Sequence, residues 1–335
     1  MPRSKFPNLS QTSMGIIDTH LSHARDEETG VIADGARVLQ RENASSVYHS
    51  TTGRLWLHNH TSRRQTYREH NYYSRQSVSG ALVCSHPLKL WDLRRHLLPR
   101  EAARVQGFPD AFRLPRTRFH RLLANAVAVP CAAHALSRVV GADEEGVTHI
   151  DLCAGIGGFS VACKRVNPKA TTIGYSEVLP YAKECYEDNF PGVQDLGDAT
   201  VLTTEWPSCT LLTAGFPCQP FSGANSRDKR KGHTHRRFYE TVLDAVDRTH
   251  AQRVVFENVS NLVTTGNEEW EALLRGLAER GFETHHSILN ALDFGLPQDR
   301  KRVYLVGRRD PSLLAPPPPP PVLPRACLGD VLLPD

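Results

Sequence analysis

The 335-residue sequence has no long apolar run, no closely spaced pair of cysteines and no internal repeat. No stretch approaches the roughly 20 apolar residues of a membrane-spanning helix, and the polar segment 1–18 lacks the pattern of a secretory signal. The eight cysteines are scattered without a C-x-x-C pair, which argues against a zinc site or a disulfide framework. We therefore expect an intracellular protein without a membrane anchor or a bound metal. The net charge of +4 is too small to establish a polyanionic partner by itself.

Composition divides the chain into a polar part, a helical part and a part in which strands and helices alternate. The hydrophobic content of 40% is enough for one substantial core and a smaller appended region. Residues 1–90 are polar and weakly periodic, so they form either a flexible region or a small recognition module. The helical part, 91–140, ends at a surface linker, 141–146. The alternating part is 147–310, and 311–335 is a proline-rich spacer with a short apolar tail.

The alternation of short apolar runs with helical stretches predicts an α/β fold. Its sheet should be doubly wound and mostly parallel, with helices on both faces. Earlier in the chain, Arg100–Val105 is amphipathic, and Ala124–Val140 spaces its apolar residues as a buried helix does. The strands expected after the linker are Val147–Leu152, Thr171–Ser176, Leu211–Ala214, Arg253–Phe256 and Arg302–Gly307, and the helices are Pro180–Asn189 and Glu268–Arg280.

A glycine-rich motif lies where the first of these strands gives way to a helix. It runs from Asp151 to Phe159 and reads Asp-Leu-Cys-Ala-Gly-Ile-Gly-Gly-Phe. Glycines let a ligand approach the backbone closely, and a following helix offers free N–H groups. An ordinary tight turn explains such a cluster equally well, so the motif indicates a ligand site only in combination with others.

Two acidic residues follow the next strands. Glu177 comes directly after one strand, and Asp198 lies in a Gly-Asp-Ala turn. Ligands of a doubly wound sheet bind at the carboxyl ends of its strands, where Glu177 can accept from ribose hydroxyls and Asp198 from an adenine amino group. For either residue taken singly, a solvated surface acid is the commoner explanation.

A cysteine between two prolines follows the strand Leu211–Ala214. The segment reads Gly-Phe-Pro-Cys-Gln-Pro-Phe-Ser and centres on Cys218. A thiolate is the side chain best able to add to an electron-poor ring carbon. Most cysteines are buried structural residues, but a position between prolines at the end of a strand argues against burial here.

Later strands deliver a carboxyl group and two arginines. Glu257 lies in Phe-Glu-Asn-Val, where an enclosed site could keep it protonated so that it donates to a ring nitrogen. Arg300 and Arg302 are two residues apart at the start of a strand, so their side chains project in the same direction.

In this order and spacing, the segments between Ile150 and Gly307 resemble the cytosine-C5 DNA methyltransferase family. The resemblance implies the fold of S-adenosylmethionine-dependent methyltransferases, with a small, poorly defined N-terminal recognition region. It implies methyl transfer from S-adenosylmethionine to C5 of cytosine in double-stranded DNA, after the base has been flipped out and Cys218 has added to C6. Such an enzyme works in the nucleus or nucleoid. A transfer-RNA cytosine-C5 methyltransferase of the same fold and a catalytically silent DNA-binding relative are the alternatives.

The resemblance assigns roles to the matching residues. Cys218 is the nucleophile, Glu257 engages N3 and the exocyclic amine, and Arg300 and Arg302 steady the pocket and its charge. The residues implied to bind the cofactor are Asp151, Cys153, Gly155, Ile156, Gly157, Gly158, Glu177, Val178, Asp198, Ala199, Pro217, Asn125 and Val127. Those implied to bind the substrate are Gln219, Ser222, Lys229, Arg230, Lys231 and Gln298.

Three positions depart from the family pattern. Cys153 and Val178 stand where the family usually has aromatic residues, and Ala124 replaces a glycine before Asn125. These changes predict weaker cofactor binding than is typical of the family. The family's recognition domain is also generally larger than residues 1–90, which leaves room for a separate specificity subunit.

The family's two closing motifs come before the glycine-rich motif, so the chain resembles a circular permutation. Leu98–Pro109 is similar to the first closing motif, and Ala124–Val127 to the second. On this interpretation 91–140 packs on a catalytic domain, 147–310, and 141–146 joins the ends that permutation brought together. The stretch Leu328–Pro334 resembles the one that leads into the family's recognition region.

Basic residues are concentrated directly after the Cys218 segment. The run from Arg227 to Arg237 could contact phosphates and close over the backbone of a flipped nucleotide. A second stretch, 63–73, mixes arginines with tyrosines, and surface solvation explains it equally well. The tripeptide His58–His60 has the letters of a metal-dependent nuclease motif, but the acidic or cysteine partners of such a site are missing nearby.

Overall fold

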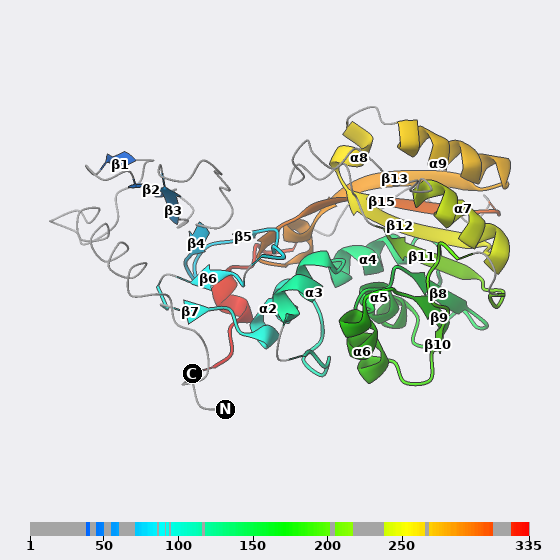
Figure 1. The fold of residues 1–335 in the computed structure, drawn as a ribbon, viewed down its shortest axis with the longest axis horizontal. Coiled ribbons are helices and arrows are strands. Elements are labelled where there is room, and N and C mark those ends of the chain that lie inside the picture. The colour runs from blue at the N-terminus through cyan, green and yellow to red at the C-terminus, as the bar shows by residue number, and fades with distance from the viewer. Residues whose placement is uncertain are drawn as a thin grey trace.

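The computed structural model describes residues 71–85, 87–90, 92–93, 95–115, 118–201, 205–216, 238–264, 268–310 and 323–334, together with the backbone of three short strands between 38 and 59. Its centre is a seven-stranded sheet in the order β10-β9-β8-β11-β12-β15-β13 (Figure 1). Five strands run parallel, and β15 is antiparallel to both of its neighbours. The strands are β8 (Thr148–Leu152), β9 (Thr171–Ser176), β10 (Gln194–Asp195), β11 (Leu211–Gly215), β12 (Arg253–Val259), β13 (Glu283–Asn290) and β15 (Lys301–Arg308).

The expected doubly wound α/β fold is therefore confirmed. β8 lies in the middle of the order, and the chain builds outward from it first through β9 and β10 and then through β11 and β12. Such a reversal leaves a crevice at the carboxyl ends of the two strands that flank it. The central strands are buried on both faces, which explains the apolar runs of β11 and β12, whereas β8 also buries His149 and Asp151.

Helices cover both faces of this sheet, and each face has its own apolar core (Figure 1). One core joins the sheet to helices near the glycine-rich motif, and the other joins it to the two long helices that follow the Cys218 segment. The helices of the first core are α4 (Val129–Leu136), α5 (Gly158–Val166) and α6 (Pro180–Asn189), and those of the second are α7 (Phe238–Thr249) and α9 (Glu268–Glu279), with the short α8 (Asn261–Thr264) between them.

The segment before the linker contains a break that the sequence pattern did not predict. A single helix over Ala124–Val140 was wrong: α3 (Phe119–Asn125) ends, Ala126 is extended with ψ at 151°, and α4 begins at Val129. Pro130 explains the break, because its ring would collide with the carbonyl of Ala126 in a continuous helix, whereas the first turn of a new helix accepts proline. The expected helix at Arg100–Val105 is present as α2 (Pro99–Val105).

The region before α2 contributes short strands. Six of them form a second sheet in the order β1-β2-β3-β4-β6-β7, which continues past residue 90 as far as His96. Its members are β1 (Val38–Gln40), β2 (Ser45–His49), β3 (Leu55–Asn59), β4 (Asn71–Tyr73), β6 (Lys89–Leu90) and β7 (Arg95–His96). A separate pair joins β5 (Ser79–Gly80) to β14 (Gln298–Asp299), which follows the short helix η2 (Ala291–Phe294).

The C-terminal tail packs against this N-terminal region. Its short helix η4 (Leu328–Val331) lies beside α2 in Figure 1, and Leu328 is fully buried. Arg104 of α2 donates to the carbonyl oxygens of Val331 (3.3 Å) and Leu332 (3.0 Å). The buried carboxylate of Glu101 accepts from the backbone N–H of Leu333 at 3.1 Å. The two ends of the described chain therefore share one packed surface, and the expected spacer Pro316–Pro321 lies outside the described residues.

The expected linker 141–146 is tied to the sheet. Glu144 forms a two-pronged ion pair with Arg253 at the start of β12, with contacts of 2.8 and 2.5 Å. Its carbonyl oxygen accepts from the Asn167 amide at 2.7 Å. In the described part of the chain, no helix is long and apolar enough to cross a membrane.

Candidate functional site

The glycine-rich loop lies at the point where the strand order reverses. It leaves β8 at Leu152 and turns through residues with positive φ into α5. Gly157, the residue before the helix, has a φ of +86°, and a Cβ there would come within 2.3 Å of the Phe190 ring. Only glycine meets both demands, so this position keeps the loop tight against α6.

Glu177 links the ends of β8 and β9. Its Oε2 accepts from the backbone N–H of Gly155 (2.8 Å), and its Oε1 accepts from those of Val178 (2.8 Å) and Leu179 (2.9 Å). The side chain is buried to 8% exposure, yet every bond it receives comes from a loop. The carboxylate therefore holds the two loops of the crevice in a fixed relation, and its remaining lone pairs can accept from a ligand.

The other residues predicted to bind a cofactor differ in exposure around this crevice. Val178 is 57% exposed, an unusual state for an apolar side chain next to a buried acid. Asp198 is exposed, and its Oδ1 accepts from the backbone N–H and the hydroxyl of Thr200. Ala199 is buried, and Cys153 is half-buried, with burial raising the pKa of its thiol.

Asp151 lies below the loop, at 1% exposure. Its carboxylate accepts from the hydroxyls of Ser160 (2.9 Å) and Thr213 (3.0 Å). The Thr213 oxygen also lies 2.8 Å from Nε2 of buried His149, whose burial lowers its pKa to about 3. Since Thr213 donates to Asp151, the neutral imidazole must donate from Nε2. Burial raises the pKa of Asp151 to about 7, and the two hydroxyl bonds oppose that rise. The structure places Asp151 where it supports the loop from beneath.

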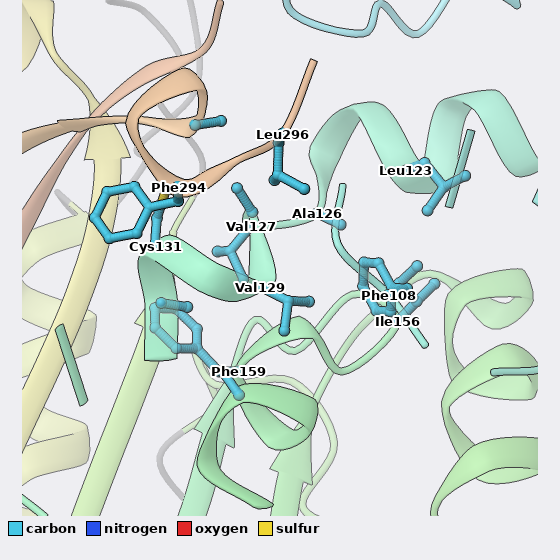
Figure 2. Packing of buried hydrophobic residues seen from close by; sticks show 14 of the residues in the cluster. Phe108, Leu123, Ala126, Val127, Val129, Cys131, Ile156, Phe159, Phe294 and Leu296 are labelled. Carbon is cyan, nitrogen blue, oxygen red and sulfur yellow. The ribbon is translucent and has the colours of Figure 1, made fainter. Parts of the chain in front are cut away.

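Val127 connects the segment before the linker to the glycine-rich loop. It lies in the break between α3 and α4, and its Cγ2 would come within 2.7 Å of a Cβ added at Gly158. Its Cγ1 lies 3.6 Å from the corresponding position at Gly215, at the end of β11. Figure 2 shows Val127 in this packing together with Phe159 and Leu296, which belong to the same core. Val127 therefore fills the space between the start of α5 and the end of β11.

Asn125 and Ile156 lie on either side of this contact. Asn125, the last residue of α3, is exposed, and its Oδ1 lies 3.2 Å from Sγ of Cys84. Ile156 is buried in the same core as Val127. The structure thus brings together Glu177, the glycine-rich loop and Val127 at the carboxyl ends of the central strands.

Glu257 occupies the second half of the site, near the end of β12. It is 8% exposed, and burial raises its pKa, while Arg302 and Arg300 oppose that rise. Nε of Arg302 lies 3.2 Å from Oε1 of Glu257, an ion pair by distance, but the N–H is not aligned for a hydrogen bond. The net direction favours a protonated carboxyl group, as a proton donor to a ring nitrogen requires.

Arg300 also forms hydrogen bonds with the segment before the linker. Its two terminal nitrogens donate to the carbonyl oxygens of Ala124 (3.1 Å), in the last turn of α3, and of Ala126 (2.9 Å), in the turn between α3 and α4. At 4% exposure its pKa falls to about 10, chiefly because of burial. Arg300 therefore fixes the turn that carries Val127, and it also interacts electrostatically with Glu257.

Gln298 was predicted to contact a substrate, but the structure buries it completely. Its amide nitrogen donates to the carbonyl oxygen of Val105 (3.1 Å) and to the side chain of Gln106. Its Oε1 accepts from the backbone N–H of Leu82 at 3.1 Å. As placed here, Gln298 joins β14 to α2 and does not face the crevice.

The predicted nucleophile Cys218 lies outside the described residues, but the chain leading to it is described. Gly215 pairs with Glu257 across the β11–β12 ladder, and the Asn258 amide donates to the carbonyl oxygen of Phe216 at 3.2 Å. The segment therefore leaves the sheet beside Glu257. The other predicted residues outside the described part are Pro217, Gln219, Ser222, Lys229, Arg230 and Lys231.

Sequence reasoning missed the residues that support the site from below. Ser160, Thr213 and His149 bond to one another or to Asp151, but they come from different elements. Strand alternation could have placed Thr213 on one face of β11, but not against Asp151. Among the described residues, no cluster of three or more His, Cys, Asp or Glu side chains could hold a metal ion.

Comparison with known proteins gives one family. A model of C-5 cytosine-specific DNA methylases matches residues 7–140 and 147–320. Type II methyltransferase M.MspI of a Moraxella species is 36% identical over 160 residues, which is 47% of this chain and 37% of that protein. Type II methyltransferase M.HhaI of Haemophilus parahaemolyticus is 36% identical over 167 residues, 48% of this chain and 49% of that protein. The chain thus spans half or less of the length of these relatives.

Solved structures resemble the chain more loosely. A DNMT2 variant of Spodoptera frugiperda has 22% identity and a TM-score of 0.41, over 49% of this chain and 50% of that one.

The contact between Val127 and Gly158 leads to a stability prediction. Gly158→Ala forces a Cβ against Val127, so it should lower the free energy of unfolding by about 1–3 kcal/mol. In a Val127→Ala background the collision disappears, and the same substitution should cost little. Chemical denaturation of the four proteins of this double-mutant cycle measures the coupling. An equal cost in both backgrounds would show that the two residues do not press on each other.

Proposed function

Because this chain belongs to the C-5 cytosine-specific DNA methylase family, we propose that it transfers a methyl group from S-adenosylmethionine to C5 of cytosine in DNA. The observation that carries this proposal is the position of Glu257. It is a buried acid with a raised pKa, an arginine stands 3.2 Å away, and the chain that leads to Cys218 leaves the sheet beside it. A nucleophile next to a proton donor is the pair that addition to a pyrimidine ring requires.

The crevice fits the proposed cofactor. An added Cβ at Gly155 would meet no atom within 4 Å, so the loop leaves open space beside the Glu177 carboxylate. Exposed Val178 offers an apolar surface for an adenine ring, and exposed Asp198 offers an acceptor for its amino group. When bound, S-adenosylmethionine supplies the methyl group. We assign Glu177 to the ribose hydroxyls, and the remaining predicted cofactor residues to the walls of the same crevice.

The base is attacked outside the duplex, since stacking blocks the C6 face of cytosine. Cys218 adds to C6 through its thiolate, and Glu257 donates a proton to N3 as electron density moves onto the ring. Arg302, beside Glu257, and Arg300, which is bonded to the α3–α4 turn, hold the pocket and its charge. C5 then carries the density needed to accept a methyl group. Loss of the C5 proton and release of Cys218 restore the aromatic ring.

Contact with double-stranded DNA is assigned to residues near the nucleophile. Lys229, Arg230 and Lys231 are placed against phosphates, where cations give affinity that does not depend on sequence. Gln219 and Ser222 follow Cys218 closely enough to reach the flipped base. Gln298, a buried residue of β14, bonds to the end of α2 and supports the site through packing. A separate specificity subunit and a location with DNA inside the cell complete the proposal.

Replacing the nucleophile tests this function. Cys218→Ala should abolish transfer of a labelled methyl group to DNA of random sequence while S-adenosylmethionine binding stays nearly intact, because the thiol is needed only for covalent addition. Cys327→Ala, on the C-terminal tail, is the matched control and should retain activity. Substrates of DNA and of RNA in parallel separate a DNA enzyme from an RNA enzyme. Turnover by Cys218→Ala at the rate of the unaltered protein would refute the mechanism.

We also propose that the chain is circularly permuted, with 1–90 as the recognition region and 91–140 as closing motifs on a catalytic domain, 147–310. The family match in two stretches that leave out 141–146 supports this arrangement. Further support comes from Val127 and Arg300, through which the closing segment completes the site. In the usual family order the linker would be a pair of chain ends, and the spacer and tail, 311–335, would lead into the recognition region.

A rearranged chain tests the permutation. Opening the linker between Ala142 and Asp143, and joining Asp335 through a flexible linker to a start near residue 20, restores the usual order. Surface loops tolerate new ends, so this protein should fold and methylate DNA. The control is the same rearrangement opened inside α9, between Leu274 and Arg275, which should not fold. A soluble, folded rearranged chain without activity would contradict the permuted architecture.

A further inference from the structure

Three buried polar atoms at and around the Glu257–Arg302 ion pair have no hydrogen-bond partner in the described part of the chain. They are Oε1 of Glu257, Nε of Arg300 and the hydroxyl of Tyr304. The three residues are 8%, 4% and 2% exposed. Buried polar groups are almost always bonded, so three unsatisfied atoms around one site require an explanation.

The pairing of strands puts Glu257 and Tyr304 on one face of the sheet, and Arg300 interacts electrostatically with both. Glu257 is the direct partner of Tyr304 in the antiparallel β12–β15 ladder, so both side chains leave the same side. Arg302, two residues before Tyr304, projects to that side as well. Helix α4 packs on this face, and its Cys131 belongs to the same core as Tyr304 and interacts electrostatically with the Tyr304 hydroxyl. Burial raises the pKa of Cys131 to about 12, so its thiol stays neutral.

The chemistry of the three atoms is complementary. Arg300 Nε and the Tyr304 hydroxyl can donate, and the Glu257 oxygen accepts when the carboxyl is ionised. None of them bonds directly to another. One buried water accepts two hydrogen bonds and donates two, so a single molecule could take both donors and donate to the acid.

We propose that Tyr304 is a positioning residue for Glu257, acting through one buried water that also accepts from Nε of Arg300. Its hydroxyl holds the acid in the orientation that faces the base. Among the described residues, the titratable and charged groups that face Glu257 are Arg302, Arg300 and Tyr304 from the β15 side and Cys131 from α4. Only the consequence for catalysis rests on the proposed function.

The sign of the effect on Glu257 follows from what Tyr304 bonds to. A donor that reaches the acid through water stabilises the ionised form, which lowers the pKa against the rise caused by burial. Removing the hydroxyl should therefore raise the pKa of Glu257. Without the hydroxyl the Glu257 carboxyl group should also be held less firmly in its orientation toward the base. We therefore expect kcat to fall, although the carboxyl group binds its proton more tightly.

Infrared titration of the whole chain tests the proposal without methyl transfer. The carboxyl band that disappears in Glu257→Gln identifies Glu257, and in Tyr304→Phe its midpoint should move to higher pH by about one unit. Tyr175→Phe is the matched control, because Tyr175 is also fully buried in the sheet but donates to Glu187 on α6, so it should leave this midpoint in place. In the transfer assay, Tyr304→Phe should lower kcat about tenfold and leave KM for S-adenosylmethionine unchanged.

An unchanged or lowered midpoint in folded Tyr304→Phe would overturn the proposal. If that variant does not fold, 3-fluorotyrosine placed at position 304 keeps the ring and makes the hydroxyl a stronger donor. The midpoint should then move to lower pH, and no movement would equally refute the role of Tyr304. Failure of the unaltered chain to methylate DNA would reject the proposed function alone, since the infrared result stands independently of it.

Discussion

The close approach of Val127 to Gly158 is the contact on which the arrangement of the site depends. It joins a segment that precedes the linker to the start of α5, which follows β8 on the other side of the linker. Pro130 breaks the helix and leaves a buried extended turn, and Arg300 bonds to the carbonyl oxygens of Ala124 and Ala126 at this break. Because Gly158 has no Cβ, Val127 can pack against it. The same turn therefore borders both the proposed cofactor side and the proposed base side of the crevice.

Three buried acids near this contact differ in the donors that they receive, and this difference gives them different roles. Asp151 receives hydroxyl donors from below and supports the loop. Glu177 receives backbone N–H groups and fixes two loops relative to each other. Glu257 receives no such donor from the described residues; burial raises its pKa, and Arg302 and Arg300 oppose that rise. A carboxylate bonded to several N–H groups is a fixed acceptor, whereas a poorly bonded buried one can exchange a proton.

The sequence was sufficient for what depends on local pattern. β9 and α6 have the bounds that were predicted, since a short apolar run and a proline at the start of a helix are strong local signals. β13 was missed because it is an edge strand with only one of its eight residues buried and three exposed, including Ile288, so it lacks a continuous apolar run. The error over Ala124–Val140 came from weighing apolar spacing above Pro130.

For the site as well, motif order predicted some features, and others depend on contacts between distant parts of the chain. Motif order indicated that Glu177, Glu257 and Arg302 would gather at one edge of the sheet, and the structure places them there. It could not indicate that Gln298 is buried against α2, because that contact joins residues nearly two hundred positions apart. The place of Tyr304 beside Glu257 likewise depends on strand register, which no single strand's sequence contains.

The central claim is that Cys218 attacks cytosine next to Glu257, and a trapped adduct tests it most directly. The chain is incubated with S-adenosylmethionine and random-sequence DNA in which 5-fluorocytosine replaces cytosine. Fluorine at C5 cannot leave as a proton does, so a thiolate adduct that has accepted the methyl group persists. After digestion, mass spectrometry should find the methylated, fluorinated nucleotide on the peptide that contains Cys218, and Cys218→Ser should yield none. An adduct on another cysteine, or methylated DNA without any adduct, would contradict the account.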